Sequence, residues 1–193
     1  MFKNSKKGFT LAEVLITLAV IGVVAAMSIP ALMGSTNNAE LKTGLKKAVS
    51  VLNQAVTMSV AMDNTDAQSY TGGGTTNIAT GAKAMRDWLA TRLNVLSTGG
   101  NATKPYLITA DGMIFTFDPG YSAGGVCGAS SSVVKGTANC GVIVDVNGAK
   151  KPNTESTGGV IKDQFFLVFK KSSVVPGQSP DNTDTTVQDA LTK

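Results

Sequence analysis

The chain has 193 residues, which suits one domain with an appendage, because single cores usually comprise about 100–200 residues. It contains no histidine and two cysteines, Cys127 and Cys140, which excludes histidine-based catalysis and argues against a zinc site. The formal charge of +4 is concentrated in Lys3, Lys6 and Lys7, and without them it falls to +1. A nearly neutral remainder attracts phosphates weakly, so we expect no nucleic-acid partner.

The first predicted element is a membrane-spanning helix. Residues 9–29 form an apolar run with one charged residue, Glu13. About 20 helical residues cross the apolar core of a bilayer. Lysines closely flank this run only on its N-terminal side, so the positive-inside rule keeps residues 1–8 in the cytoplasm. We therefore expect residues 9–33 to form a transmembrane or filament-core helix, with residues 34–193 in the periplasm or outside the cell.

Glu13 is the residue of this helix that calls for an explanation. A carboxylate within a membrane helix costs on the order of 2.5–3.5 kcal/mol, which favours a partner of opposite charge. The alternative is that Glu13 lies at the cytoplasmic interface and stays hydrated. The physical chemistry of the residue alone leaves these two interpretations even.

The segment KGFTLAE, residues 7–13, resembles the processing site of type IV pilins and type II secretion pseudopilins. In that family a membrane aspartyl peptidase, the prepilin peptidase, cuts after the glycine and methylates the new N-terminal amine. The resemblance implies a leader peptide of residues 1–8, cleavage between Gly8 and Phe9, and an N-methyl group on Phe9. It also implies that Glu13 neutralises the N-terminal amine of a neighbouring subunit, which relieves two charges that are each costly alone in lipid.

Two further residues extend the resemblance. Gly22 and Pro30 stand where family members carry a glycine and a proline, and both residue types weaken a helix. In assembled family members the stretch between them can lose helicity. For Pro30 the alternative is a simple kink where the helix leaves the membrane. A conventional secretory signal with residues 14–26 as its apolar region competes with this interpretation, but it accounts for neither Glu13 nor the residues around Gly8.

The next predicted elements are helical. Apolar or small residues recur at spacings of three and four after the membrane segment, which predicts one long helix from about Phe9 to Met62. Its amphipathic half, residues 34–62, would pack under the head. A loop is predicted over residues 63–81 and a second helix at roughly Gly81–Leu96, with Trp88 as a core anchor. The buried stripe of the long helix would comprise Leu41, Leu45, Ala48, Leu52, Ala55, Val56 and Ser59.

From Pro105 onward the pattern indicates strands. Residues 106–110 and 113–117 flank Asp111-Gly112, which is a two-residue hairpin signal, and residues 141–146 and 164–170 supply two more strands. Three or four antiparallel strands on the long helix predict an α+β, pilin-like head with one buried face. The polar tail, about residues 172–193, is predicted to be mobile or a surface loop.

Two structural sites are expected in the head. Cys127 and Cys140 would form a disulfide, worth roughly 3 kcal/mol, because the membrane segment indicates export; the alternative is two free thiols in a reducing compartment. A weaker resemblance to pilin-like bacterial proteins begins at residue 144. It implies that Asp145, Asn147 and Asp163 gather around a Ca²⁺, as a loop does in some major pseudopilins. The alternative is that these side chains hydrogen-bond their own turn backbone. No other cofactor is expected.

These observations predict a structural subunit of a type IV pilus or a type II secretion-type pseudopilus. Its partners would be the prepilin peptidase, identical or related subunits, and an inner-membrane assembly platform. The alternative is a minor pilin or a singly anchored binding module whose head contacts a surface, a secreted substrate or DNA. An exported enzyme is not expected, because the chain has no nucleophile elbow, cysteine–histidine pair or phosphate-binding loop.

Overall fold

The structure is a computed structural model that describes residues 8–65, 78–101, 104–117, 140–178 and 185–192. The chain divides into two compact units, residues 1–39 and residues 40–193. The first helix, α1 (Leu11–Asp63), contributes its beginning to the first unit and its remainder to the second.

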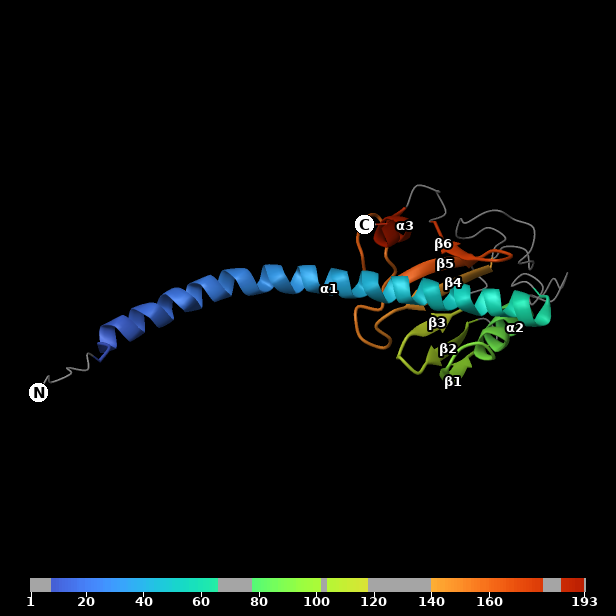
Figure 1. The fold of residues 1–193 in the computed structure, drawn as a ribbon, viewed down its shortest axis with the longest axis horizontal. Coiled ribbons are helices and arrows are strands. Elements are labelled where there is room, and N and C mark those ends of the chain that lie inside the picture. The colour runs from blue at the N-terminus through green and yellow to red at the C-terminus, as the bar shows by residue number, and fades with distance from the viewer. Residues whose placement is uncertain (1–7, 66–77, 102–103, 118–139, 179–184, 193) are drawn as a thin grey trace, which may run out of the picture. The chain divides into compact units, whose positions relative to one another are not determined.

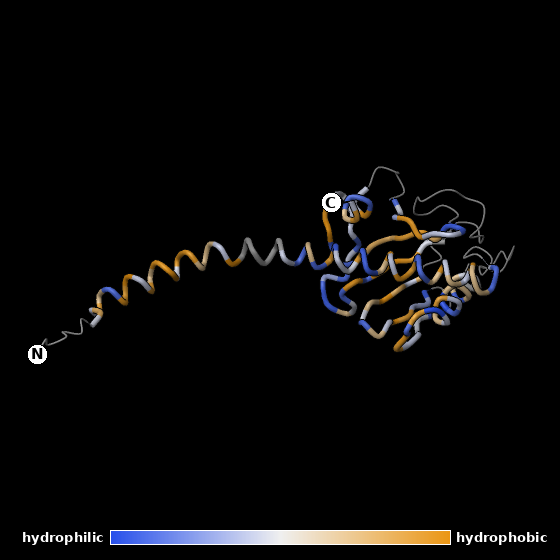
Figure 2. Tube along the Cα trace, viewed as in Figure 1, coloured by the Kyte–Doolittle hydropathy of each residue, from blue (hydrophilic) through white to orange (hydrophobic). Residues whose placement is uncertain are grey.

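The first unit contains an apolar helical stretch. Leu11–Ile29 has a mean hydropathy of 2.3, and none of it is buried within the structure. By length and composition this stretch can cross a membrane, and Figure 2 shows its hydrophobic residues in orange along the whole segment. An apolar helix with every face exposed needs lipid or other helices around it.

The second unit is built on a six-stranded antiparallel sheet whose spatial order follows the sequence, β1 to β6 (Figure 1). Each strand is therefore hydrogen-bonded to its predecessor. The strands are β1 (Val95–Gly100), β2 (Pro105–Thr109), β3 (Ile114–Thr116), β4 (Cys140–Asp145), β5 (Gln164–Phe169) and β6 (Val174–Pro176). Two further helices complete the unit, α2 (Ile78–Ala90) and α3 (Thr186–Thr192).

The core lies between the sheet and the second part of α1. The predicted stripe of α1 is confirmed, because Leu45, Ala48, Leu52 and Val56 are fully buried and pack into one cluster with strand residues. The strand side of that cluster comprises Leu107, Met113, Phe115, Phe117, Val142, Val144, Phe165, Leu167, Phe169 and Val174. The α+β, pilin-like layout predicted from periodicity is thus what the structure shows.

Trp88 of α2 closes one end of this core, as predicted. Its ring meets Phe169 edge to face with the centroids 5.9 Å apart, and the side chain is only 3% exposed. α3 also joins the core, through Val187 and Ala190.

The end of α2 differs from the prediction. The helix was expected to reach Leu96 but ends at Ala90, where the Arg92 N–H donates to the Leu89 carbonyl in a tight turn. Four residues after Ala90 the chain is already beside β2, because the Asn94 carbonyl accepts the Ala110 N–H at 2.9 Å. β1 then begins at Val95. Pairing with β2 therefore overrides the helical periodicity that had suggested a longer α2.

The hairpin between β2 and β3 is confirmed in place but not in loop length. The Gly112 N–H donates to the Thr109 carbonyl, and the Thr109 N–H donates to the Met113 carbonyl, so three residues form the loop rather than two. Gly112 has φ +89°, the left-handed conformation that this loop type requires at its last position.

The tail prediction was wrong for two segments. Val174–Pro176 forms β6, and the Val174 N–H donates to the side-chain oxygen of Asn53 on α1 at 2.8 Å. Thr186–Thr192 forms α3. The low apolar content of the tail concealed the few apolar residues, Val174, Val187 and Ala190, that reach the core. Most of the predicted loop 63–81 lies outside the described residues.

Candidate processing and assembly site

The beginning of α1 carries the residues that the processing motif names. Gly8, Phe9 and Thr10 precede the helix in non-helical, exposed backbone. Phe9 is 90% exposed, and a side chain added at Gly8 would meet nothing within 4 Å in this chain. Within the described residues, packing therefore does not require a glycine at residue 8. The Gly8–Phe9 peptide bond lies in this exposed backbone, and cleavage there stays a prediction.

Thr10 and Glu13 hold each other at the helix N-terminus. The Thr10 N–H and its hydroxyl both donate to Glu13 Oε2 at 2.9 Å, and the Glu13 N–H donates back to Thr10 Oγ1 at 3.3 Å. This is a capping box, in which a threonine and a glutamate three residues later satisfy backbone donors that the helix leaves unpaired. The first helical bond, from the Val14 N–H to the Thr10 carbonyl, closes the same turn.

Thr10 is a hydrogen-bond partner of Glu13 that the sequence analysis missed. The signal was present, since a threonine three residues before a glutamate and ahead of an apolar run is the pattern of a capping box. The cost of a carboxylate in a membrane predicts a charged partner for Glu13 but says nothing of a neighbouring hydroxyl. The Thr10 hydroxyl donates to the Glu13 carboxylate within the single chain, so this contact needs no neighbouring subunit.

Glu13 retains capacity for a second partner. Both donors from Thr10 use Oε2, and within the described residues Oε1 accepts no hydrogen bond. None of the ion pairs found among those residues involves Glu13. Phe9 and Glu13 line the same hollow of about 400 Å³ together with Val14 and Thr17. The residue that would become the N-terminus and the carboxylate thus face one space.

Gly22 and Pro30 lie within α1, and the backbone is helical at both positions. The Ser28 hydroxyl donates to the Val24 carbonyl in this stretch at 2.9 Å. Weakening of the helix between residues 22 and 30 in an assembled filament stays a prediction. The predicted disulfide also stays a prediction, because Cys127 lies outside the described residues, while Cys140 begins β4.

The three residues of the predicted calcium site lie near one another. Asp145 ends β4, Asn147 follows in the turn, and Asp163 directly precedes β5. Asp163 is fully buried, and its carboxylate accepts the backbone N–H groups of Asn153 at 2.7 Å and Thr154 at 2.9 Å. Among the residues that the structure describes, no three His, Cys, Asp or Glu side chains converge, so any cation here depends on amide and carbonyl oxygens as well.

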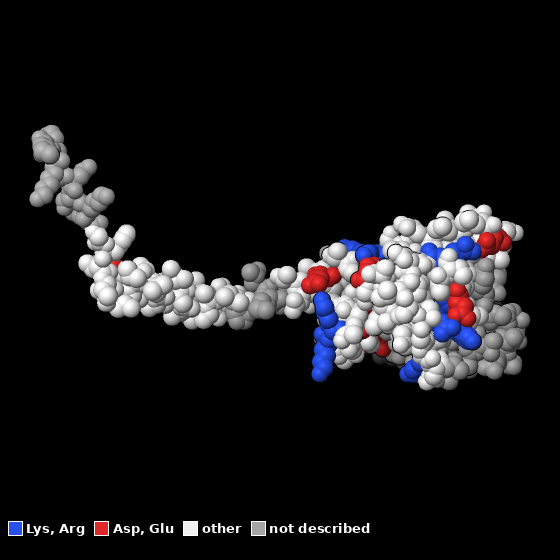
Figure 3. All heavy atoms as spheres, turned by 90° about the horizontal axis from the view of Figure 1, so that it is seen from below, with Lys and Arg blue, Asp and Glu red and all other residues white. Residues whose placement is uncertain are grey.

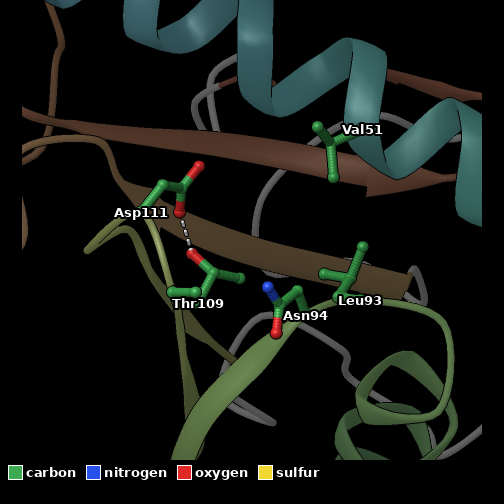
Figure 4. A pocket seen from close by; sticks show the side chains of 6 residues that line it. Val51, Leu93, Asn94, Thr109 and Asp111 are labelled. Carbon is green, nitrogen blue, oxygen red and sulfur yellow. Dashed lines mark hydrogen bonds between the residues drawn. The ribbon is translucent and has the colours of Figure 1, made fainter.

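A second hollow, of about 250 Å³, lies where α1, the α2–β1 turn and the β2–β3 hairpin meet (Figure 4). Its walls include Val51, Leu93 and Asn94. Thr109 donates its hydroxyl to the Asp111 carboxylate, and Lys47 forms an ion pair with the same carboxylate at 2.7 Å. Thr109, Asp111 and Lys47 therefore bond to one another and stabilise the hairpin. We assign the hollow no ligand.

Comparison with known families agrees with the site at the beginning of α1. Residues 3–29 match the family described as the prokaryotic N-terminal methylation motif. No solved structure matches the chain. The matched segment contains Gly8, Phe9, Thr10, Glu13 and Gly22 and ends at the last residue of the apolar stretch. Residues 3–29 therefore carry the prepilin-type signature of type IV pilins and pseudopilins, on a chain with a pilin-like α+β layout.

Proposed function

We propose that this chain is the precursor of a structural subunit of a type IV pilus or a type II secretion-type pseudopilus. The observation that carries the proposal is Glu13, a capped carboxylate that lies within the processing signature and in the first turn of an exposed apolar helix. Among the described residues no cation pairs with it. The motif implies processing by a prepilin peptidase and assembly with other pilins. It also favours a structural rather than an enzymatic role.

Cleavage would create the missing counter-charge. Hydrolysis of the Gly8–Phe9 bond releases the leader as a carboxylate and leaves an amine on Phe9, which stays positively charged after methylation. An ammonium and a carboxylate are each expensive in lipid, and a pair of them is much less so. Glu13 Oε1 is open to such a group while Oε2 remains with Thr10.

The pair has to come from a neighbouring copy to direct assembly. Lipid tails are as apolar as leucine, so exchanging lipid for neighbouring helices along Leu11–Ile29 gains little hydrophobic free energy. Apolar contacts alone would also allow one helix to slide along another. An ammonium–carboxylate pair is local and directional, so it fixes the axial register of one subunit against the next.

The head supports a subunit role rather than a nucleic-acid role. On the face shown in Figure 3, basic and acidic residues are interspersed over the described part of the head. A binding module for DNA would need a continuous basic surface. A minor pilin that contacts a secreted substrate or a surface is the second candidate, and the two differ in whether the chain forms the bulk of the filament.

Intact mass of the protein isolated from its native membrane tests the proposal. We expect the mass to lack residues 1–8 and to include one added methyl group. A protein cut near Ser28, or one that keeps its leader in the cell, would remove the assignment. Quantification of the chain in purified filaments then separates a major from a minor subunit.

A further inference from the structure

We draw no further inference here: the strongest candidate, the apolar face of the sheet opposite the core, which includes Ile108 of β2, Ile114 of β3 and Ile143 of β4, carries none, because nothing in the described part of the chain shows what covers it.

Discussion

The indole N–H of Trp88 donates a hydrogen bond to the hydroxyl of Ser59 at 3.1 Å, and this bond joins α2 to α1 inside the core. Ser59 is fully buried, and its hydroxyl also lies 3.2 Å from the Thr65 carbonyl oxygen. The Ser59 hydroxyl is therefore close to two partners, Thr65 just after α1 and Trp88 in α2. Ser59 thus lies in the buried stripe of α1 because its hydroxyl accepts a hydrogen bond from α2.

Removal of this hydroxyl should destabilise the head. Ser59→Ala takes away the acceptor of a buried N–H, which costs about 1–3 kcal/mol in the free energy of unfolding. Thermal or urea unfolding in detergent measures the loss. Ser50→Ala, at an exposed position of the same helix, is the matched control and should change the free energy by less than about 0.5 kcal/mol. Equal stability of the two variants would contradict the role of Ser59.

Gly44→Ala should also destabilise the head, although alanine is the better helix former. The new methyl group would meet the Val146 Cβ at 2.9 Å, and overpacking of this kind costs about 1–3 kcal/mol. The free energy of unfolding of the full chain measures it. Adding Val146→Gly removes the Cβ that the new methyl group would meet, so the double variant should lose less stability than the sum of the two single changes. Gly22→Ala meets no neighbour within 4 Å in the chain, so it should leave the stability of the head unchanged.

Glu13→Ala should insert and be processed but enter filaments poorly. The variant keeps the Gly8–Phe9 bond exposed, yet it leaves the amine of the neighbouring Phe9 without a counter-charge. Breaking such a buried pair from one side costs several kcal/mol, so filament yield should fall at least tenfold. Sheared filaments and membrane fractions, compared by immunoblot, provide the measurement. Normal yield would defeat the pairing idea without touching the processing assignment.

Thr10→Val should show the effect of the capping box alone, because it removes the Thr10 hydroxyl and keeps the Glu13 carboxylate. Valine keeps the shape of threonine but cannot donate or accept at the position that now bonds Glu13. Loss of an N-cap costs about 0.5–2 kcal/mol, so the Glu13 and Val14 amides, which bond to Thr10, should exchange hydrogen several-fold faster in micelles. Thr10→Ser retains the hydroxyl and should restore protection. Unchanged exchange in the valine variant would show that the capping box does not hold the helix start.

Acid should weaken the β2–β3 hairpin through Asp111. Burial raises the pKa of Asp111, but the hydrogen bond and charge of Lys47 and the hydroxyl of Thr109 lower it by more, so it lies below its ordinary value of 3.8. A lowered pKa in the folded state contributes stability that is present above pH 3.8 and is lost as the pH falls through the folded value. The Tm difference between the unmodified chain and Asp111→Asn should therefore shrink below that pH. A constant difference down to pH 2.5 would contradict the ion pair.

Much of the helical framework was predictable because one physical signal dominates it. Leu45, Ala48 and Leu52 face the core at the helical period, so the local sequence is enough to identify the buried face. β1 and β6 were not predictable in the same way. Val95 and Val174 become strand residues because Thr109 and Phe169 lie opposite them, and that pairing is a property of the folded unit rather than of the local sequence.

The processing motif and the predicted calcium site differ in the same way, since the first is local in sequence and the second depends on long-range contacts. Gly8, Phe9 and Glu13 are neighbours in sequence, so a local motif identifies them. The contact between Asp163 and the backbone of Asn153 was not predicted, because the two residues are ten positions apart in the sequence. Contacts of that kind become visible only once two strands have brought their ends together.

The strict succession of strands from β1 to β6 has a consequence for export. A chain that leaves the membrane with its N-terminal helix anchored delivers α1 first and then each strand in turn. Each strand after β1 would then emerge when its preceding neighbour in the sheet and the apolar stripe of α1 are already outside. If the chain is exported as proposed, the sheet can therefore grow by adding each new strand to one edge as it emerges, and no strand after β1 has to wait for its first hydrogen-bonding neighbour.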